Sequence, residues 1–184
     1  MSNSKTFSVR DMVFAALFAA VLCAVAPFSI SIGPVPLSFA TLVIYLAAGV
    51  LDIKTSLLSV LLYILMGAIG LPVFSGFGGG FNKIIGVTGG FIVGYIPLAL
   101  AVGIALRAFG KKTWLYASSM VVGTFVLYAI GTVWFVAQSG RSVSAALTLC
   151  VVPFLPGDVA KIIVACLIAP RLREITSRAS RRRG

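Results

Sequence analysis

Two ionisable residues, Asp158 and Lys161, are the clearest candidates for chemistry in this sequence. They lie three positions apart at the start of an apolar run, so on a helix their side chains share one face. Charged side chains within a membrane span are costly unless paired or hydrated, and they usually serve a function. We therefore expect a ligand site here. A helix cap explains Asp158 alone, because the charge of Lys161 opposes the helix dipole, and a simple internal ion pair is the other alternative.

A second polar position lies in a glycine-dense segment, residues 71–88, which contains Asn82 and Lys83. The phosphate-binding pattern G-x-x-x-x-G-K-[ST] is absent, so we expect no nucleotide site. The glycines allow either close approach of the backbone to a ligand or a re-entrant turn. Asn82 offers hydrogen-bond donors and acceptors there.

Composition excludes several classes of catalytic and metal site. The chain has no histidine and only 4 acidic residues, which removes histidine-dependent triads and most zinc and carboxylate sites. Cys23, Cys150 and Cys166 form no C-x-x-C motif, so neither a metal site nor a redox pair is indicated. We expect no enzymatic activity, no metal and no cofactor.

The elements that must position these residues are membrane helices. Of 184 residues, 60% are hydrophobic and 10% are charged, and the mean hydropathy is +1.11, whereas soluble domains carry about 25% charged residues. The net charge of +11 comes largely from residues beside apolar runs. That placement indicates a topology signal and attraction to anionic lipid, and we expect no nucleic-acid partner.

The fold expected is an all-α integral membrane protein with six transmembrane helices in a single domain, residues 1–184. Residues 12–51 carry no charge, which is too long for one span of about 20 residues, and Pro27 and Gly33–Pro36 divide the run. An apolar stretch at 142–154 fits a short interfacial helix. The predicted helices are 9–28, 37–51, 55–70, 89–108, 114–137 and 157–170, the last ending at Pro170 before a basic cytoplasmic tail, 171–184.

Basic residues orient this bundle. With six spans, twelve Lys and Arg residues lie on the side of the termini and only Lys83 and Arg141 lie on the other. The positive-inside rule then makes both termini cytoplasmic. Asn82, Asp158 and Lys161 lie on or beside outward loops, so a closed bundle brings them to one outer pocket.

Helix 9–28 carries small residues at Ala15 and Ala19, and again at Ala16 and Ala20. Small residues four apart allow helices to approach closely. Ordinary packing within the bundle is the simpler interpretation, and a docking face for a partner is the alternative.

Five motifs follow one another along the chain: G-P-V-P-L-S-F-A-T at 33–41, G-L-P-V-F at 70–74, G-V-T-G-G-F at 86–91, Y-x-x-G-x-x-W at 128–134 and P-F-L-P-G-D-V-A-K at 153–161. In this order, on six predicted spans, they resemble the BioY family, the biotin-binding S components of energy-coupling-factor (ECF) transporters. The resemblance covers nearly the whole chain. Ala40, Val87 and Phe91 stand where the family commonly has Gln, Pro and Tyr.

The resemblance implies a multi-pass protein of a prokaryotic cell membrane that binds biotin from outside for ATP-driven uptake. It implies an ECF transmembrane coupling subunit and two cytoplasmic ATPases as partners. The alanine-x-x-x-alanine docking face of such proteins matches Ala15 and Ala19. The implied substrate-binding residues, where the motifs match, are Asn82, Asp158, Lys161, Thr88, Gly89, Gly90 and Thr41.

The chemistry of biotin agrees with these residues. Asn82 and Asp158 suit ureido N–H groups, and Lys161 suits an anionic or carbonyl oxygen. Three alternatives remain: an S component for another vitamin, a proton-coupled carrier in which Asp158 and Lys161 relay a proton, and a structural membrane subunit without a ligand.

Overall fold

The computed structural model of the chain describes residues 7–30, 35–109 and 112–181. Within these ranges the chain is a bundle of α-helices with one short antiparallel ribbon, in which Ser29 of β1 pairs with Ser38 of β2. The elements are α1 (Val9–Val25), β1 (Ser29–Ile30), β2 (Leu37–Ser38), α2 (Ala40–Val50), α3 (Ile53–Ala68), η1 (Ser75–Phe77), α4 (Phe81–Ile85), α5 (Gly89–Phe109), α6 (Thr113–Ser139), α7 (Val143–Cys150), η2 (Val152–Phe154) and α8 (Leu155–Arg181).

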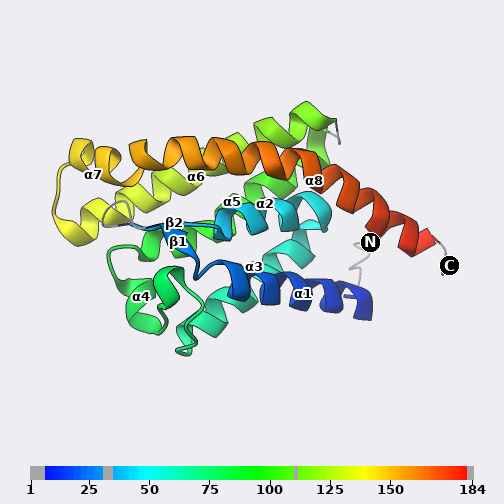
Figure 1. Cartoon of the computed structure of the whole chain (residues 1–184), viewed down its shortest axis with the longest axis horizontal. Helices are drawn as coiled ribbons and strands as arrows, with labels where there is room; N and C mark the ends of the chain where they lie inside the picture. The colour runs from blue at the N-terminus through cyan, green and yellow to red at the C-terminus, as the bar shows by residue number, and fades with distance from the viewer. Residues whose placement is uncertain (1–6, 31–34, 110–111, 182–184) are drawn as a thin grey trace, which may run out of the picture.

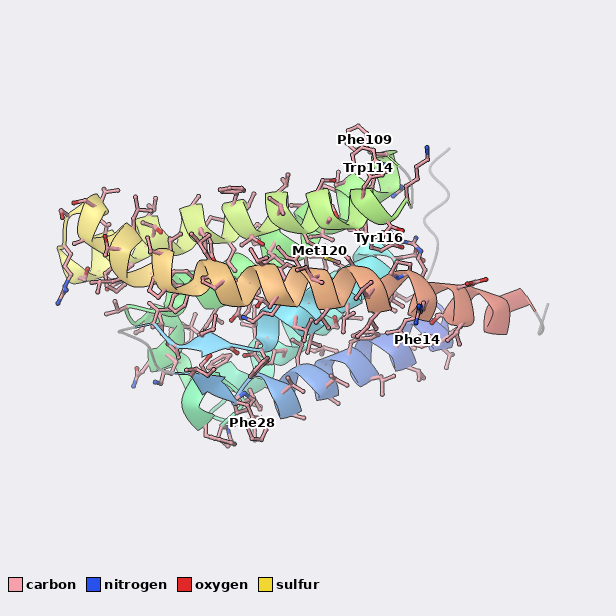
Figure 2. The ribbon with its side chains drawn as sticks, turned by 45° about the horizontal axis from the view of Figure 1, so that its top comes forward. Phe14, Phe28, Phe109, Trp114, Tyr116 and Met120 are labelled. Carbon is pink, nitrogen blue, oxygen red and sulfur yellow. The ribbon has the colours of Figure 1, made fainter. Side chains whose placement is uncertain are left out.

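The elements sort to two ends of the bundle. The start of α1, the α2–α3 turn, the end of α5, the start of α6 and the end of α8 lie at one end, and the ribbon, α4 and α7 lie toward the other (Figure 1). The start of α1 lies close to the last turns of α8, because the Arg10 guanidinium donates to the carbonyl oxygen of Thr176 at 2.6 Å. Figure 2 shows Phe109 and Trp114 projecting from the α5–α6 turn, where they are 74% and 65% exposed.

Three helical stretches of the described chain are long and apolar enough to cross a membrane. They are Gly89–Phe109, Thr113–Ser139 and Val143–Thr176. The helices α2 and α3 are apolar but shorter, and the 11 residues of α2 rise only about 16 Å. An all-α membrane protein is therefore confirmed, while the number of crossings stays a prediction.

Close contacts between helices depend on small residues in the core. The helices α5 and α6 pack against each other most extensively, and α2 packs along α8. A Cβ added to Gly49 of α2 would lie 2.9 Å from the Cβ of Ala169 in α8 and 3.3 Å from the Tyr116 ring. Glycine at this position therefore sets how closely α2 approaches α8.

Several predicted boundaries shift in the structure. The first helix ends at Val25 and not at 28, because the chain turns at Ala26 and Pro27 and enters β1. The ribbon strand β2 occupies the first two residues of the predicted helix 37–51. The glycine-dense segment contains η1 and α4, which were not predicted, whereas the expected short helix within 142–154 is present as α7.

The prediction that the last helix ends at Pro170 is wrong. Helix α8 starts two residues earlier than expected and continues through Pro170 to Arg181, so much of the expected tail is helical. Proline removes one helix hydrogen bond, but contacts on both sides of it hold the helix together. Ala169 is fully buried, and Arg173 donates to the carbonyl oxygen of Gly49 at 3.1 Å.

Ala15 and Ala19, which the sequence offers as a docking face, are buried within the bundle. Their side chains are 0% and 6% exposed, because α1 packs chiefly against α3 with this face. They fit the simpler interpretation, packing within the bundle. The second pair of small residues, Ala16 and Ala20, lies on the exposed side of α1.

Candidate functional site

A pocket lies between the ribbon end of α2, the start of α5, the middle of α6 and the start of α8. The empty space in and around it is about 350 Å³, a figure that includes open solvent. The lining residues come from four parts of the chain: Val35, Pro36, Leu37, Ser38, Thr41, Phe91, Tyr95, Leu127, Tyr128, Phe154, Asp158 and Lys161.

Lys161 is the centre of the polar side of this pocket. Its ammonium donates to Asp158 Oδ1 at 3.0 Å, to the Ser38 carbonyl oxygen at 2.7 Å and to Thr41 Oγ1 at 3.1 Å. An ammonium has three protons, so these acceptors satisfy all of them. The side chain is 6% exposed. Lys161 thus joins α8 to β2 and α2 through buried, charge-assisted hydrogen bonds.

Asp158 has a second partner on α6. The hydroxyl of Tyr128 donates to Asp158 Oδ2, while Oδ1 accepts from Lys161. A carboxylate has about four acceptor sites, so two remain for a ligand. Asp158 is 5% exposed and lines the pocket. Burial with two donors fixes the direction of its oxygens and leaves acceptor capacity for a bound molecule.

Ser38 is itself fixed by its neighbours. Its hydroxyl donates to the Ala26 carbonyl oxygen at 2.8 Å and accepts from the backbone N–H of Ala40 at 3.0 Å. The carbonyl that Lys161 contacts therefore belongs to a residue tied to the end of α1 and the start of α2. The ribbon therefore supplies a backbone acceptor beside the pocket, although it contributes no ionisable side chain.

Apolar and aromatic side chains make up the rest of the wall. Phe91 and Tyr95 come from α5, Leu127 and Tyr128 from α6, and Phe154 from η2, and all are at least nine-tenths buried. Such a wall suits a flat or ring-shaped ligand with apolar faces. The pocket therefore combines an apolar enclosure with one charged, hydrogen-bonding corner.

The predicted site residues divide into two groups. Thr41, Asp158 and Lys161 line the pocket together. Asn82, Thr88, Gly89 and Gly90 are not among its lining residues: Asn82 is exposed on α4, and Thr88 is partly exposed just before α5. Gly89 and Gly90 are buried, and a Cβ on Gly89 would lie 1.7 Å from the Ile84 carbonyl oxygen, so glycine is required for this tight turn.

Two sequence interpretations change at this site. Asp158 is not the cap of the last helix, because α8 already begins at Leu155. The internal ion pair with Lys161 exists, and it lies at the wall of a pocket. The first motif also supplies pocket residues, although its Gly33 and Pro34 lie outside the described residues.

Sequence reasoning missed the roles of Tyr128 and Ser38. Tyr128 belongs to the fourth motif, whose spacing gave no indication of a partner on α8. Ser38 contributes a backbone carbonyl, which any residue type offers, so no residue pattern identifies it.

The arrangement is suited to binding. Among the described residues, no group of three His, Cys, Asp or Glu side chains is placed to hold a metal ion. The pocket offers a fixed carboxylate acceptor, a fixed ammonium donor and apolar walls. It therefore fits a small molecule that carries N–H groups, an oxygen acceptor and an apolar ring.

Comparison with known proteins gives a consistent picture. The model of the BioY family matches residues 1–178. A biotin transporter BioY of Thermotoga maritima is 36% identical over 91% of this chain and 98% of its own length. A probable biotin transporter BioY of Pyrococcus horikoshii is 38% identical over 89% of this chain and 96% of its own length.

A solved structure shares the fold. The crystal structure of the S-component for biotin from an ECF-type ABC transporter superposes with a TM-score of 0.83. The two are 25% identical in sequence, and the match covers 95% of each chain.

Proposed function

Because this chain belongs to the BioY family, we propose that it is the biotin-binding S component of an ECF-type ABC importer. Its task is to capture biotin from outside the cell, and the family is one of transport subunits and not of enzymes. Biotin is the substrate, and no cofactor takes part.

The observation that supports this assignment most directly is the Asp158–Lys161 pair at the pocket wall. Biotin has a ureido ring with N–H donors and a carbonyl acceptor, an apolar thiophane ring and a carboxylate tail. A buried carboxylate accepts from N–H groups, and an ammonium donates to an oxygen. The aromatic wall of Phe91, Tyr95 and Phe154 supplies the apolar cover.

The hydrogen bonds at this pocket assign different roles to the two charges. Asp158 has unused acceptor sites, so it takes a ureido N–H without losing a partner. Lys161 already has three acceptors. A ligand oxygen must therefore replace one of them, and the two uncharged partners are the Ser38 carbonyl oxygen and Thr41 Oγ1.

Thr41, Asp158 and Lys161 form the core of the proposed site. Asn82, Thr88, Gly89 and Gly90 stay in the proposed set on the strength of their motif. The glycines shape the chain beside Phe91, which lines the pocket. Asn82 offers an exposed amide on α4 at the same end of the bundle.

The proposed topology has six crossings with both termini in the cytoplasm. Its support is the sorting of turns: α1 starts, α2 meets α3, α5 meets α6 and α8 ends at one end of the bundle (Figure 1). The basic residues at this end, such as Lys54, Arg107 and Arg171, support a cytoplasmic location for it by the positive-inside rule. The pocket then opens toward the outside of a prokaryotic cell membrane.

An S component requires the rest of an ECF transporter, which we propose to be a transmembrane coupling subunit and two cytoplasmic ATPases. The docking face that the structure supports is the exposed side of α1. Ala16 and Ala20 lie there, flanked by Val13 and Leu17, which are 60% and 53% exposed. Small residues four apart allow a helix of another subunit to approach closely.

Calorimetry on the purified chain in detergent tests the substrate. We expect selective binding of about one biotin per chain, with riboflavin and thiamine giving no heat. Binding of another vitamin in place of biotin would redirect the assignment to that vitamin. A folded sample that binds none of them would overturn the proposal and favour a structural subunit.

A further inference from the structure

The fourth sequence motif, Y-x-x-G-x-x-W, occupies one face of α6, and substrate contact alone does not explain it. Tyr128, Gly131 and Trp134 lie three positions apart in the middle and outer part of this helix, so they follow one side of it. Each faces a different part of the pocket wall or of the segment that leads into that wall.

Tyr128 faces α8. Its hydroxyl donates to Asp158 Oδ2, and the residue is 7% exposed. The ammonium of Lys161 donates to the other oxygen, Oδ1, from within α8 itself. Tyr128 is therefore the described partner that fixes Asp158 relative to α6, and it determines which acceptor sites remain for a ligand.

Gly131 faces α5. A Cβ on Gly131 would lie 2.4 Å from Cε1 of Phe91, so the aromatic ring fills the space that a side chain would need. Phe91 lines the pocket and is 8% exposed. Because Gly131 has no side chain, the Phe91 ring can pack directly against α6. This packing sets the position of one pocket wall.

Trp134 faces the segment just before α5. Its indole N–H donates to the Gly86 carbonyl oxygen at 3.0 Å. A Cβ on Gly90 would lie 2.2 Å from the Cβ of Trp134, so the chain passes directly against this side chain. Trp134 does not line the pocket. Its contacts fix the position of residues 86–90, which directly precede Phe91 in the chain.

We propose that Tyr128, Gly131 and Trp134 form a positioning face that sets the distance between the two walls of the biotin site. The first wall carries Asp158 on α8, and the second carries Phe91 at the start of α5. The inference rests on the proposed function. It adds that α6, which holds neither charge of the site, determines how well the site fits its ligand.

Two ordinary explanations fall short of these contacts. A tryptophan near a membrane interface needs only its amphipathic ring there, yet this indole has a specific carbonyl acceptor in another segment. A buried tyrosine needs only some partner for its hydroxyl, yet this one contacts the carboxylate of the proposed site. All three residues act on the two walls of the same pocket.

Biotin affinity of conservative variants tests the positioning face. Tyr128→Phe removes only the hydroxyl, and Trp134→Phe removes the indole N–H. A hydrogen bond to a charged group is worth roughly tenfold in affinity, so we expect Tyr128→Phe to bind biotin about tenfold more weakly. Trp134→Phe should weaken binding about threefold to tenfold, as for a neutral hydrogen bond. The control is Val133→Ala, at a 70% exposed position of the same helix, which should bind as the unmodified chain does.

A double-mutant cycle separates positioning from general stability. If Tyr128 acts through Asp158, Tyr128→Phe should change affinity by less than about twofold in an Asp158→Asn background. Should Asp158→Asn leave no measurable binding, Asp158→Glu closes the cycle, because it keeps a carboxylate at a displaced position. A purely structural role would lower the melting temperature of Tyr128→Phe and give the same fold-loss in both backgrounds.

The outcomes also separate this inference from the assignment of biotin. If the unmodified chain fails to bind biotin, the proposed function fails. If it binds biotin and both Tyr128→Phe and Trp134→Phe bind equally well, the function stands and the positioning face is refuted. Equal losses in the two backgrounds of the cycle would refute it as well.

Discussion

The ammonium of Lys161 lies 2.7 Å from the carbonyl oxygen of Ser38, a residue 123 positions earlier in the chain. This contact joins the last long helix to the short ribbon after α1. It also brings an ammonium that is paired with Asp158 to a buried backbone acceptor. Lys161 therefore contributes both to the packing of the fold and to the proposed binding site, and mutation can separate the two effects.

Removing one charge of the buried pair should destabilise the protein more than removing both. Asp158→Asn leaves an unpaired ammonium, and Lys161→Met leaves an unpaired carboxylate, each costing about 3–5 kcal/mol. The double variant Asp158→Asn/Lys161→Met should recover most of the melting temperature, because no isolated charge remains. Melting curves that follow the reaction of a dye with the buried thiols of Cys150 and Cys166 provide the measurement.

Biotin binding should not recover in that double variant. Each single substitution and the double substitution should weaken biotin binding at least about tenfold, because charge-assisted hydrogen bonds to the ligand are lost. Lys54→Ala serves as the control, since it removes one exposed positive charge at the opposite end of the bundle. Unchanged calorimetric affinity in well-folded single variants would remove Asp158 and Lys161 from the site.

Bulky residues on the exposed side of α1 should block assembly and spare biotin binding. Ala16→Trp and Ala20→Trp place an indole where close approach of another helix requires a small side chain. Co-purification with a tagged coupling subunit measures assembly, and calorimetry measures binding. Val133→Trp, on the exposed side of α6, should assemble normally.

The same experiment distinguishes the two pairs of small residues. Ala15 is fully buried, so Ala15→Trp should reduce folded yield and melting temperature and thereby lower binding and assembly together. Normal assembly of both Ala16→Trp and Ala20→Trp would show that the docking surface lies elsewhere.

Topology is testable with single cysteines. In a background where Cys23 is replaced by alanine, Arg141→Cys should react with a membrane-impermeant thiol reagent in intact cells. Lys54→Cys should react only after the membrane is opened, because the two exposed positions lie at opposite ends of the bundle. The reverse pattern would invert the proposed orientation, and reaction of both positions in intact cells would contradict the number of crossings.

Arg173→Ala should lower stability without changing biotin affinity. The Arg173 guanidinium donates to the Gly49 carbonyl oxygen in the last turn of α2, and this contact supports α8 beyond Pro170. A partly buried hydrogen bond of this kind contributes about 1–2 kcal/mol, so the melting temperature should fall by several degrees. An unchanged melting temperature would mean that helix continuity past Pro170 does not need Arg173.

The sequence predicted the membrane class and the charged pair well, because both follow from residue types. Long uncharged runs indicate spans, and the spacing of Asp158 and Lys161 places them on one face. It failed at Pro170, because a proline ends a helix only when no tertiary contact compensates, and Ala169 and Arg173 supply such contacts.

Surface and interior could not be told apart on α1 from sequence. Both Ala15–Ala19 and Ala16–Ala20 have the same spacing, and the helix is apolar on nearly every side. Only packing against α3 shows that the first pair is buried. In a soluble protein, polar residues would have marked the exposed face of the helix. A helix in lipid can carry apolar residues on both its buried face and its exposed face.

The three positions at which this chain departs from the family's motifs differ in how close they lie to the pocket. Phe91, where tyrosine is common, lines the pocket with its ring beside Gly131. Ala40 is fully buried and contacts the site through its backbone N–H, and Val87 is 39% exposed. Of the three positions, Phe91 is therefore the one most directly able to alter ligand contact.

The pairing of Asp158 with Lys161 also fixes the electrical balance of a transport cycle. Their opposite charges cancel, so the pair adds no net charge to the pocket. A bound biotin adds the single negative charge of its own carboxylate, and that charge alone moves inward with it. An inside-negative potential opposes the movement of that charge by about 2.3 kcal/mol per 100 mV, so uptake of the anion against this potential needs an input of energy.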